Sequence, residues 1–182
     1  MTFPLTLLGA LLCSLTVSSE VVPQADFDVQ GIAGKWYLLG FATNAKWFVN
    51  SRASMKMATA MVTPTADGEL DLSYSSLKSD GSCWRMNNVA KKTDVAGKFT
   101  YRGRGGMKEV YMVDVKCDEY ALVHTTKSKG STGNPTVVNK LFGRAVDLSA
   151  DLLEKFRQFS LETGILPENI AFLPKNAECP AA

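Results

Sequence analysis

Few residues in this sequence could do nucleophilic or metal chemistry. His124 is the only histidine among 182 residues, and the cysteines are Cys13, Cys83, Cys117 and Cys179. A zinc site needs three or four such ligands close together, and no motif places a serine or cysteine beside His124. We therefore expect no metal centre, no cofactor and no histidine-assisted nucleophile. His124 lies on an alternating segment, which fits either a hydrogen-bonded core histidine or one that lines a pocket.

The N-terminus has the pattern of a secretory signal. Residues 3–17 carry no charge, are too short to span a bilayer, and are followed by Ser18 and Ser19. We expect a signal peptide over residues 1–19 and one secreted, extracellular domain over residues 20–182; the alternative is a buried N-terminal helix. Cleavage removes Cys13 and leaves three cysteines, so a disulfide in this oxidising compartment leaves one thiol over.

The amino-acid composition limits the kinds of partner that the chain is expected to bind. With 46% hydrophobic and 21% charged residues it suits a single domain with a substantial core, and no later segment is apolar enough for a membrane span. The net charge of +2 is too small to indicate a nucleic-acid partner. Residues 91–108 hold six basic side chains and one acidic one, which fits a solvated hairpin or a surface for anions.

The segment that must position any site is residues 35–42, which is apolar on both alternating faces. Trp36, Leu38, Gly40 and Ala42 share one face under strict alternation. Both faces need cover, and a closed barrel with a second layer outside it provides that cover. Seven further strand patterns follow between short turn signals, at residues 55–63, 69–77, 83–91, 99–102, 109–115, 120–126 and 137–144. The sequence therefore predicts an all-β fold, an eight-stranded antiparallel up-and-down barrel.

After the last strand the hydrophobic period changes to that of a helix. Ser149 is a good N-cap, and the apolar stripe that follows ends before Gly164. The stripe consists of Leu152, Leu153, Phe156 and Phe159. This helix could cover the outer wall of the barrel or close its end. The tail over residues 165–179 is expected to run back along the wall.

Three short motifs in this order resemble the signature regions of the lipocalins. They are Gly34-x-Trp36 on the first strand, the turn at residues 116–120, and Arg144 after the eighth strand. The resemblance implies that Trp36 plugs the closed end and that the Arg144 guanidinium lies across its ring. It also implies a disulfide between Cys83 and Cys179, which leaves Cys117 free at the closed end.

Within that family the chain is most similar to the prostaglandin D synthase branch, through segments such as Val62-x-Pro64-x-x-Asp67-Gly68. The resemblance places that branch's nucleophilic cysteine at Ala58, and its helper hydroxyls at Leu38, Ala60 and Tyr74. Only the tyrosine keeps a hydroxyl, so the resemblance implies a protein that is not an enzyme. The alternative is an isomerase that uses a different residue.

The resemblance implies a monomeric carrier with a small hydrophobic ligand inside the barrel. The ligand classes are retinoids, fatty acids, bile pigments and steroids, held by apolar contact and a few polar groups. Lys56, near the mouth of the barrel, could contact the carboxylate head group of a ligand, or its side chain could extend into solvent. A macromolecule bound through residues 91–108 is a third possibility. The expected ligand-binding residues are Leu38, Gly40, Ala42, Lys56, Ala58, Ala60, Val62, Leu70, Leu72, Tyr74 and His124.

Overall fold

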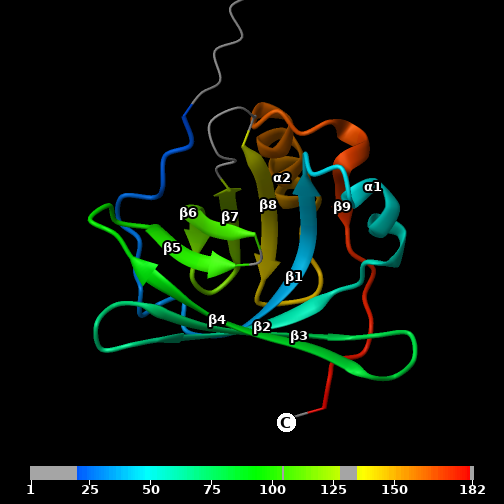
Figure 1. Ribbon diagram of the computed structural model, residues 1–182, viewed down its shortest axis with the longest axis horizontal. Coiled ribbons are helices and arrows are strands. Elements are labelled where there is room, and N and C mark those ends of the chain that lie inside the picture. The colour runs from blue at the N-terminus through cyan, green and yellow to red at the C-terminus, as the bar shows by residue number, and fades with distance from the viewer. Residues whose placement is uncertain (1–19, 104, 128–134, 181–182) are drawn as a thin grey trace, which may run out of the picture.

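The computed structural model describes residues 20–103, 105–127 and 135–180, so the expected signal segment at residues 1–19 lies outside it. Consecutive antiparallel strands form one sheet that closes where β1 pairs with β2 (Figure 1). The strands are β1 (Gly34–Thr43), β2 (Ala58–Pro64), β3 (Leu70–Leu77), β4 (Cys83–Lys92), β5 (Lys98–Gly103), β6 (Gly106–Lys116), β7 (Tyr120–Lys127), β8 (Thr136–Gly143) and the short β9 (Ile170–Phe172). The predicted eight-stranded barrel is confirmed, and β9 adds a ninth strand beside β1.

The connection after β1 forms a small flap at the open end of the barrel. It contains the helix α1 (Phe48–Ser51) and a 3₁₀ turn over Arg52–Ser54, so β2 begins three residues later than the sequence pattern indicates. Phe48 is fully buried and stacks on Phe41 with 5.5 Å between ring centroids. Trp47 beside it is half exposed. The flap is therefore anchored by one aromatic ring and presents the other to the mouth.

A bulge in β1 changes which side chains face the interior. The pairing of β1 with β8 shifts register between Leu38 and Gly40, so Leu39 is an extra residue. An extra residue reverses the alternation beyond it. Leu38 and Phe41 consequently belong to the interior cluster, whereas Ala42 belongs to the cluster under the helix.

The helix α2 (Ala150–Glu162) covers the outer face of β1 and β8 (Figure 1). The Ser149 side chain accepts a hydrogen bond from the Leu152 amide, as expected of an N-cap. Phe156 is fully buried and packs onto Gly40, where the absence of a side chain lets the helix approach. The outer-wall prediction is confirmed, and the alternative of a helix that closes the barrel end is wrong. Among the described residues, no helix is long and apolar enough to cross a membrane.

This packing predicts that Gly40→Ala destabilises the protein. A Cβ at position 40 would lie 2.9 Å from both Leu141 Cβ and Phe156 Cε1. We expect a loss of about 1–3 kcal/mol in the free energy of unfolding, as for overpacked cores, measured by urea denaturation. Ala58→Val, on the cavity wall, is the matched control and should change stability little. Equal stabilities of the two variants would contradict the outward placement of Gly40.

Within the barrel, strand pairing is shortest between β4 and β5. These strands pair only at Lys91 with Thr100 and at Lys92 with Phe99, next to their turn, and then diverge (Figure 1). A shallow hollow of about 480 Å³ lies there, lined in part by Asn88, Arg102 and Met107. The other neighbouring strands of the barrel pair along most of their length.

Trp36 and Arg144 occupy the closed end. Trp36 is 2% exposed, its indole donates to the Ile32 carbonyl at 2.8 Å, and the Arg144 guanidinium carbon lies 3.8 Å from its ring centroid. Gly34, with φ of +97°, adopts a backbone conformation that side chains disfavour, and a Cβ there would meet Arg144 Nη1 at 3.3 Å. The geometry expected for these three residues is therefore present.

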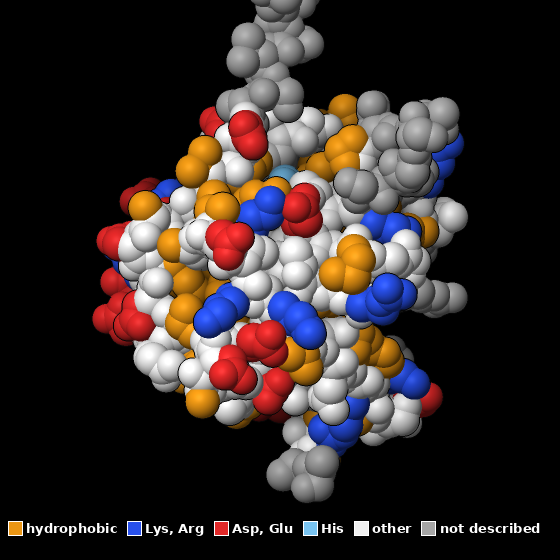
Figure 2. Space-filling view, turned by 60° about the vertical axis from the view of Figure 1, so that its left-hand side comes forward, with side chains coloured by type: hydrophobic (Ala, Val, Ile, Leu, Met, Phe, Trp, Pro, Cys, Tyr) orange, Lys and Arg blue, Asp and Glu red, His pale blue; other side chains and the backbone are white. Residues whose placement is uncertain are grey.

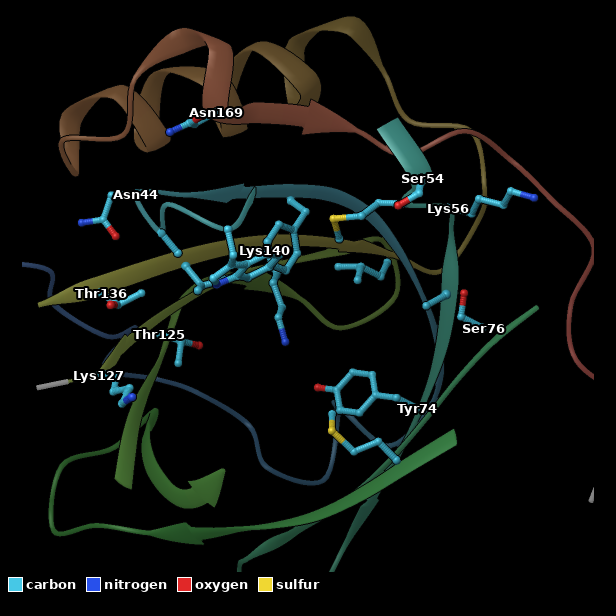
Figure 3. Close-up of a pocket in the computed structure, with 18 of the residues that line it drawn as sticks. Asn44, Ser54, Lys56, Tyr74, Ser76, Thr125, Lys127, Thr136, Lys140 and Asn169 are labelled. Carbon is cyan, nitrogen blue, oxygen red and sulfur yellow. The ribbon is translucent and has the colours of Figure 1, made fainter. Parts of the chain in front are cut away.

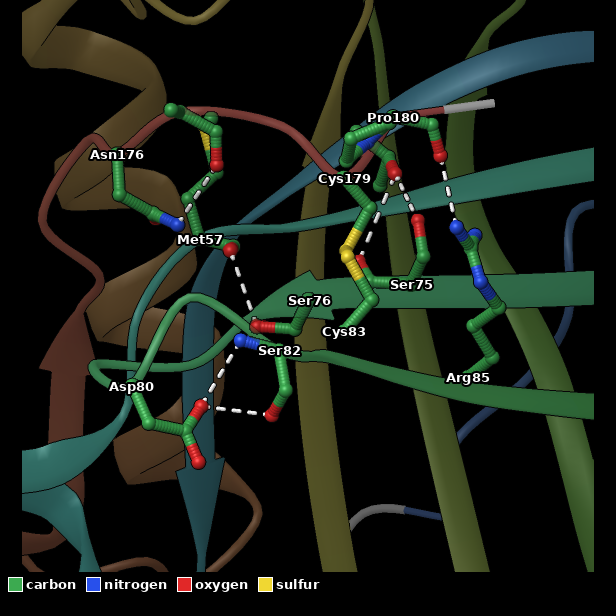
Figure 4. The surroundings of a disulfide bond; sticks show 12 residues. Met57, Ser75, Ser76, Asp80, Ser82, Cys83, Arg85, Asn176, Cys179 and Pro180 are labelled. Carbon is green, nitrogen blue, oxygen red and sulfur yellow. Dashed lines mark hydrogen bonds between the residues drawn. A yellow bond between two sulfur atoms is a disulfide. The ribbon is translucent and has the colours of Figure 1, made fainter. Parts of the chain in front are cut away.

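The C-terminal tail returns along the barrel and is tied to it by the disulfide between Cys83 and Cys179 (Figure 4). Beside the bridge, Arg85 donates to the Pro180 carbonyl at 2.7 Å. Earlier in the tail, the Leu173 amide donates to the Leu39 carbonyl at 2.8 Å. Cys117 is the free thiol of the described residues, so the expected pairing is confirmed.

Candidate ligand-binding cavity

A cavity of about 1350 Å³ occupies the barrel interior and opens under the flap. Its apolar lining comes from several strands and from the flap, and includes Leu38, Phe41, Trp47, Met55, Ala58, Leu77, Trp84 and Val138. A deeper, nearly filled compartment of about 60 Å³ lies toward Trp36 and is lined in part by Ala60, Val62 and Leu72. The open space therefore lies in the outer part of the barrel, and the closed end is packed.

The charge of the cavity is one-sided. Among the described residues its lining contains no aspartate or glutamate. It contains six lysines, namely Lys46, Lys56, Lys78, Lys108, Lys127 and Lys140. Cationic groups without anionic partners in a low-dielectric cavity create a positive potential that favours an anion. The lining is therefore suited to an apolar molecule that carries a negative charge.

Lys140 is the deepest of these lysines that the structure places in the interior. It comes from the middle of β8 and lines both compartments. Figure 3 shows its side chain directed into the cavity toward Tyr74, whose ring centroid lies 5.2 Å from Lys140 Nζ. Burial lowers the pKa of Lys140 to about 8, and the positive charge of Lys108 contributes to the shift. Burial also raises the pKa of Tyr74, so its hydroxyl is protonated at neutral pH.

Two more lysines continue this cluster toward the mouth. Lys108 on β6 lies over the Tyr101 ring, with Nζ 5.4 Å from the centroid. Burial lowers the pKa of Lys108, and the charge of Lys127 on β7 adds to the effect. Burial raises the pKa of Tyr101. These amines repel one another, and the described lining contains no carboxylate to offset the repulsion. An anionic ligand would therefore stabilise the charged form of each amine.

Most of the expected ligand-binding residues do line the cavity. Leu38, Lys56, Ala58 and Tyr74 border the main compartment, and Ala60, Val62, Leu70, Leu72 and Tyr74 border the deep one. The placement of Gly40 and Ala42 in the interior is wrong, because the β1 bulge turns both toward α2. Lys56 stands at the rim, where Nζ donates to Ser79 Oγ at 3.3 Å, and its side chain points away from the cavity (Figure 3).

His124 does not line the cavity either. It is 3% exposed and lies under α2, with its ring edge-to-face against Phe159 at 6.0 Å. Its Nδ1–H donates to Asn139 Oδ1 at 2.7 Å, and Asn139 Nδ2 donates to Thr163 Oγ1 at 2.8 Å. Burial lowers the pKa of His124, and the Asn139 contact partly opposes that shift. Of the two interpretations of His124, the hydrogen-bonded core histidine is therefore correct.

Sequence reasoning missed Lys108 and Lys140. The signal for both was present, since each is a lysine two residues from apolar side chains on the same strand face. On β8, Lys140 lies between Val138 and Phe142 on the same strand face. On β6, Lys108 lies two residues before Val110. All three apolar residues line the cavity compartments. A lysine that alternates with the inward-facing apolar residues of a strand is therefore the pattern that identifies this cluster.

Among the described residues, no cysteine lines the cavity. Ala58 presents only a methyl group to it. Cys117 lies at the closed end, where its carbonyl accepts from Arg144 Nε at 2.8 Å. Burial raises the pKa of the Cys117 thiol, and the nearby charge of Asp28 adds to the effect, which lowers its thiolate fraction. The described residues also contain no group of three or more candidate metal ligands.

The basic side chains that the structure describes within residues 91–108 do not all face the solvent as free cations. Lys98 Nζ pairs with Glu109 Oε1 at 2.8 Å, and Lys108 turns into the cavity. In the middle of the face shown in Figure 2, acidic and basic side chains stand beside one another. This arrangement gives the macromolecule-binding interpretation no contiguous cationic patch on that face.

A closed antiparallel barrel with an external helix and a deep calyx defines a class of proteins that enclose small ligands. The model of the lipocalin / cytosolic fatty-acid binding protein family matches residues 33–177, and the chain belongs to the lipocalin family. Members of this family bind small hydrophobic ligands in the barrel.

Individual relatives agree with this assignment. A protein named lipocalin from Rhinella marina is 40% identical over 170 residues, which cover 92% of this chain and 91% of the relative. Prostaglandin-H2 D-isomerase of Canis lupus familiaris is 31% identical over 177 residues, which cover 96% of this chain and 91% of the relative. Among solved structures, the siderocalin Ex-FABP, described as working through dual ligand specificities, matches with a TM-score of 0.70 at 28% identity. That match covers 82% of this chain and 99% of the neighbour.

Proposed function

We propose that the protein is a secreted, monomeric carrier for a small lipophilic anion. The observation that carries the proposal is the cavity of about 1350 Å³ whose described lining combines apolar side chains with the interior amines of Lys108 and Lys140 and contains no carboxylate. Fatty acids, carboxylated retinoids, acidic bile pigments and acidic steroid conjugates share that chemistry. Affinity comes mainly from apolar area removed from water, at roughly 25 cal/mol per Å², and the amines select the charge.

The arrangement favours a ligand with its anionic group inward. Lys140 and Lys108 lie in the interior, whereas Lys56 at the rim is directed outward (Figure 3). The compartment beyond Lys140 has only about 60 Å³, too little for an acyl chain. The apolar body then occupies the outer space beside Phe41, Trp47 and Trp84. Of the two alternatives that the sequence left open for Lys56, a head-group contact or extension into solvent, this orientation favours the second.

Retinoic acid and retinol test the proposal because they share an apolar body and differ in charge. Lys140→Met should weaken retinoic acid roughly 10- to 100-fold, the value of one charge-assisted hydrogen bond, and leave retinol nearly unchanged. Lys56→Met is the matched control and should affect neither ligand. Ala58→Trp should weaken both by about tenfold or more, because its ring takes ligand space. Quenching of tryptophan fluorescence measures each affinity; a folded Ala58→Trp variant with unchanged affinities would refute binding in the cavity.

The affinity for retinoic acid should also depend on pH in a defined direction. A bound carboxylate raises the pKa of Lys140 above its value of about 8 in the free protein. Between about pH 6 and 8, where the ligand carboxylate is ionised, affinity is therefore flat, and above about pH 8 it falls by up to about tenfold per pH unit as the free amine loses its proton. Retinol should show no such fall.

A second candidate function is prostaglandin isomerisation, which is favoured by the relatives that bear that name. The position implied for the nucleophile is Ala58, and a methyl group cannot attack a peroxide oxygen. We expect turnover of prostaglandin H2 with added thiol to equal the buffer rate. Ala58→Cys alone should add little, and Ala58→Cys with Leu38→Ser and Ala60→Ser should add more. Turnover by the unmodified protein that is lost on alkylation of Cys117 would establish an enzyme instead.

A further inference from the structure

The lysine cluster differs from an ordinary anion site in one respect: the amine of Lys140 has neighbours that disfavour its charge. Burial and the positive charge of Lys108 on β6 both disfavour the ammonium form, and the described lining supplies no carboxylate to offset them. With its pKa lowered to about 8, Lys140 is neutral in a much larger fraction of molecules at neutral pH than an exposed lysine is. A neutral amine is a nucleophile, and an ammonium group is not.

We propose that Lys140 forms a reversible imine with a lipophilic aldehyde held in the cavity. The proposal rests on the carrier function above, because the cavity must first take up the apolar body of the aldehyde. Lys140 Nζ projects into open space that such a ligand would fill, on the side of the cavity toward the Tyr74 hydroxyl (Figure 3). The inward orientation argued for a carboxylate places an aldehyde carbon at the same amine.

The reaction balances without an oxidant or reductant. The Lys140 lone pair attacks the carbonyl carbon and forms a C–N bond, and a proton passes from nitrogen to oxygen to give a carbinolamine. The carbinolamine then loses water, with cleavage of the C–O bond and formation of a C=N double bond. The proton lost from nitrogen leaves with the hydroxyl as water, and the protonated Tyr74 hydroxyl can donate a hydrogen bond to the departing oxygen.

Retinaldehyde is the probe, because its absorbance distinguishes a protonated imine from a neutral one. The full chain is incubated with retinaldehyde, reduced with borohydride and digested, and the modified peptide is identified by mass spectrometry. We expect a single adduct on Lys140 that forms faster as the pH rises through 8. The positive charge of Lys108 disfavours a protonated imine, so the absorbance should not move to the long wavelengths of that form.

Matched variants separate this chemistry from simple binding. Lys140→Arg keeps the positive charge and should still bind retinoic acid, but should give no adduct; Lys56→Arg should give the same adduct as the unmodified protein. Retinoic acid in excess should block the reaction. Adducts spread over exposed lysines of the unmodified protein, or an equal yield in Lys140→Arg, would overturn the proposal. If retinoic acid binds and no adduct forms, the imine alone fails; if neither binds, the carrier function fails.

Discussion

Removal of the Cys83–Cys179 bridge should lower the free energy of unfolding by about 4–5 kcal/mol. The bridge closes a loop with a sequence separation of 96, and the loss of loop-closure entropy in the unfolded chain gives this magnitude. The measurement is urea denaturation of Cys83→Ala/Cys179→Ala beside the unmodified protein. In thermal melts the same change corresponds to a fall in Tm of roughly 10–15 °C for a domain of this size.

The remaining contacts of the tail are too weak to replace the bridge. Glu178 accepts from Tyr37 at 2.9 Å and pairs with Lys35 at 2.5 Å, but these side chains are substantially exposed, and exposed pairs contribute roughly 0–1 kcal/mol. Cys117→Ala is the control, because it removes a cysteine and leaves the bridge intact. A double variant within 1 kcal/mol of this control would show that the tail is held mainly by its non-covalent contacts.

The barrel and its helix could be predicted because their signals are local. Period-two alternation, short turns and the Ser149 cap each act over a few residues, and all of them indicate the same topology. The resemblance of the motifs that contain Gly34, Trp36 and Arg144 to the family signatures then implied which residues close the barrel. These elements appear in the structure close to their expected bounds.

The site was less predictable because it depends on register. One extra residue in β1 reversed the faces of Gly40 and Ala42, and no strong local signal marks that bulge. The cluster of Lys108, Lys127 and Lys140 is assembled from three strands, so its electrostatics exist only after folding. The resemblance placed Ala58, Ala60 and Tyr74 in the interior correctly, because β2 and β3 pair without a register shift.

The closed end gives the other large stability effect, with Trp36→Ala expected to cost about 3–5 kcal/mol. Trp36 is 2% exposed, and its removal leaves a large cavity and an unpaired Ile32 carbonyl. Arg144→Met should cost a similar amount for a different reason. Its guanidinium donates to four backbone carbonyls, those of Cys117, Lys35, Gly31 and Ala33, at 2.8–3.2 Å, and each loses a charged donor.

A double-mutant cycle separates the contact between these residues from their other roles. The guanidinium carbon lies 3.8 Å from the Trp36 ring centroid, so the pair should show a coupling of about 1–2 kcal/mol in urea unfolding. Arg144→Lys is the matched control, because it keeps the charge but loses the planar fork that reaches several carbonyls, and should recover only part of the stability. A coupling near zero would mean that Arg144 acts through the backbone carbonyls alone. In that case the tryptophan is held by burial, and the stacked geometry follows from the turns that carry Gly31, Ala33 and Cys117 rather than from attraction to the ring.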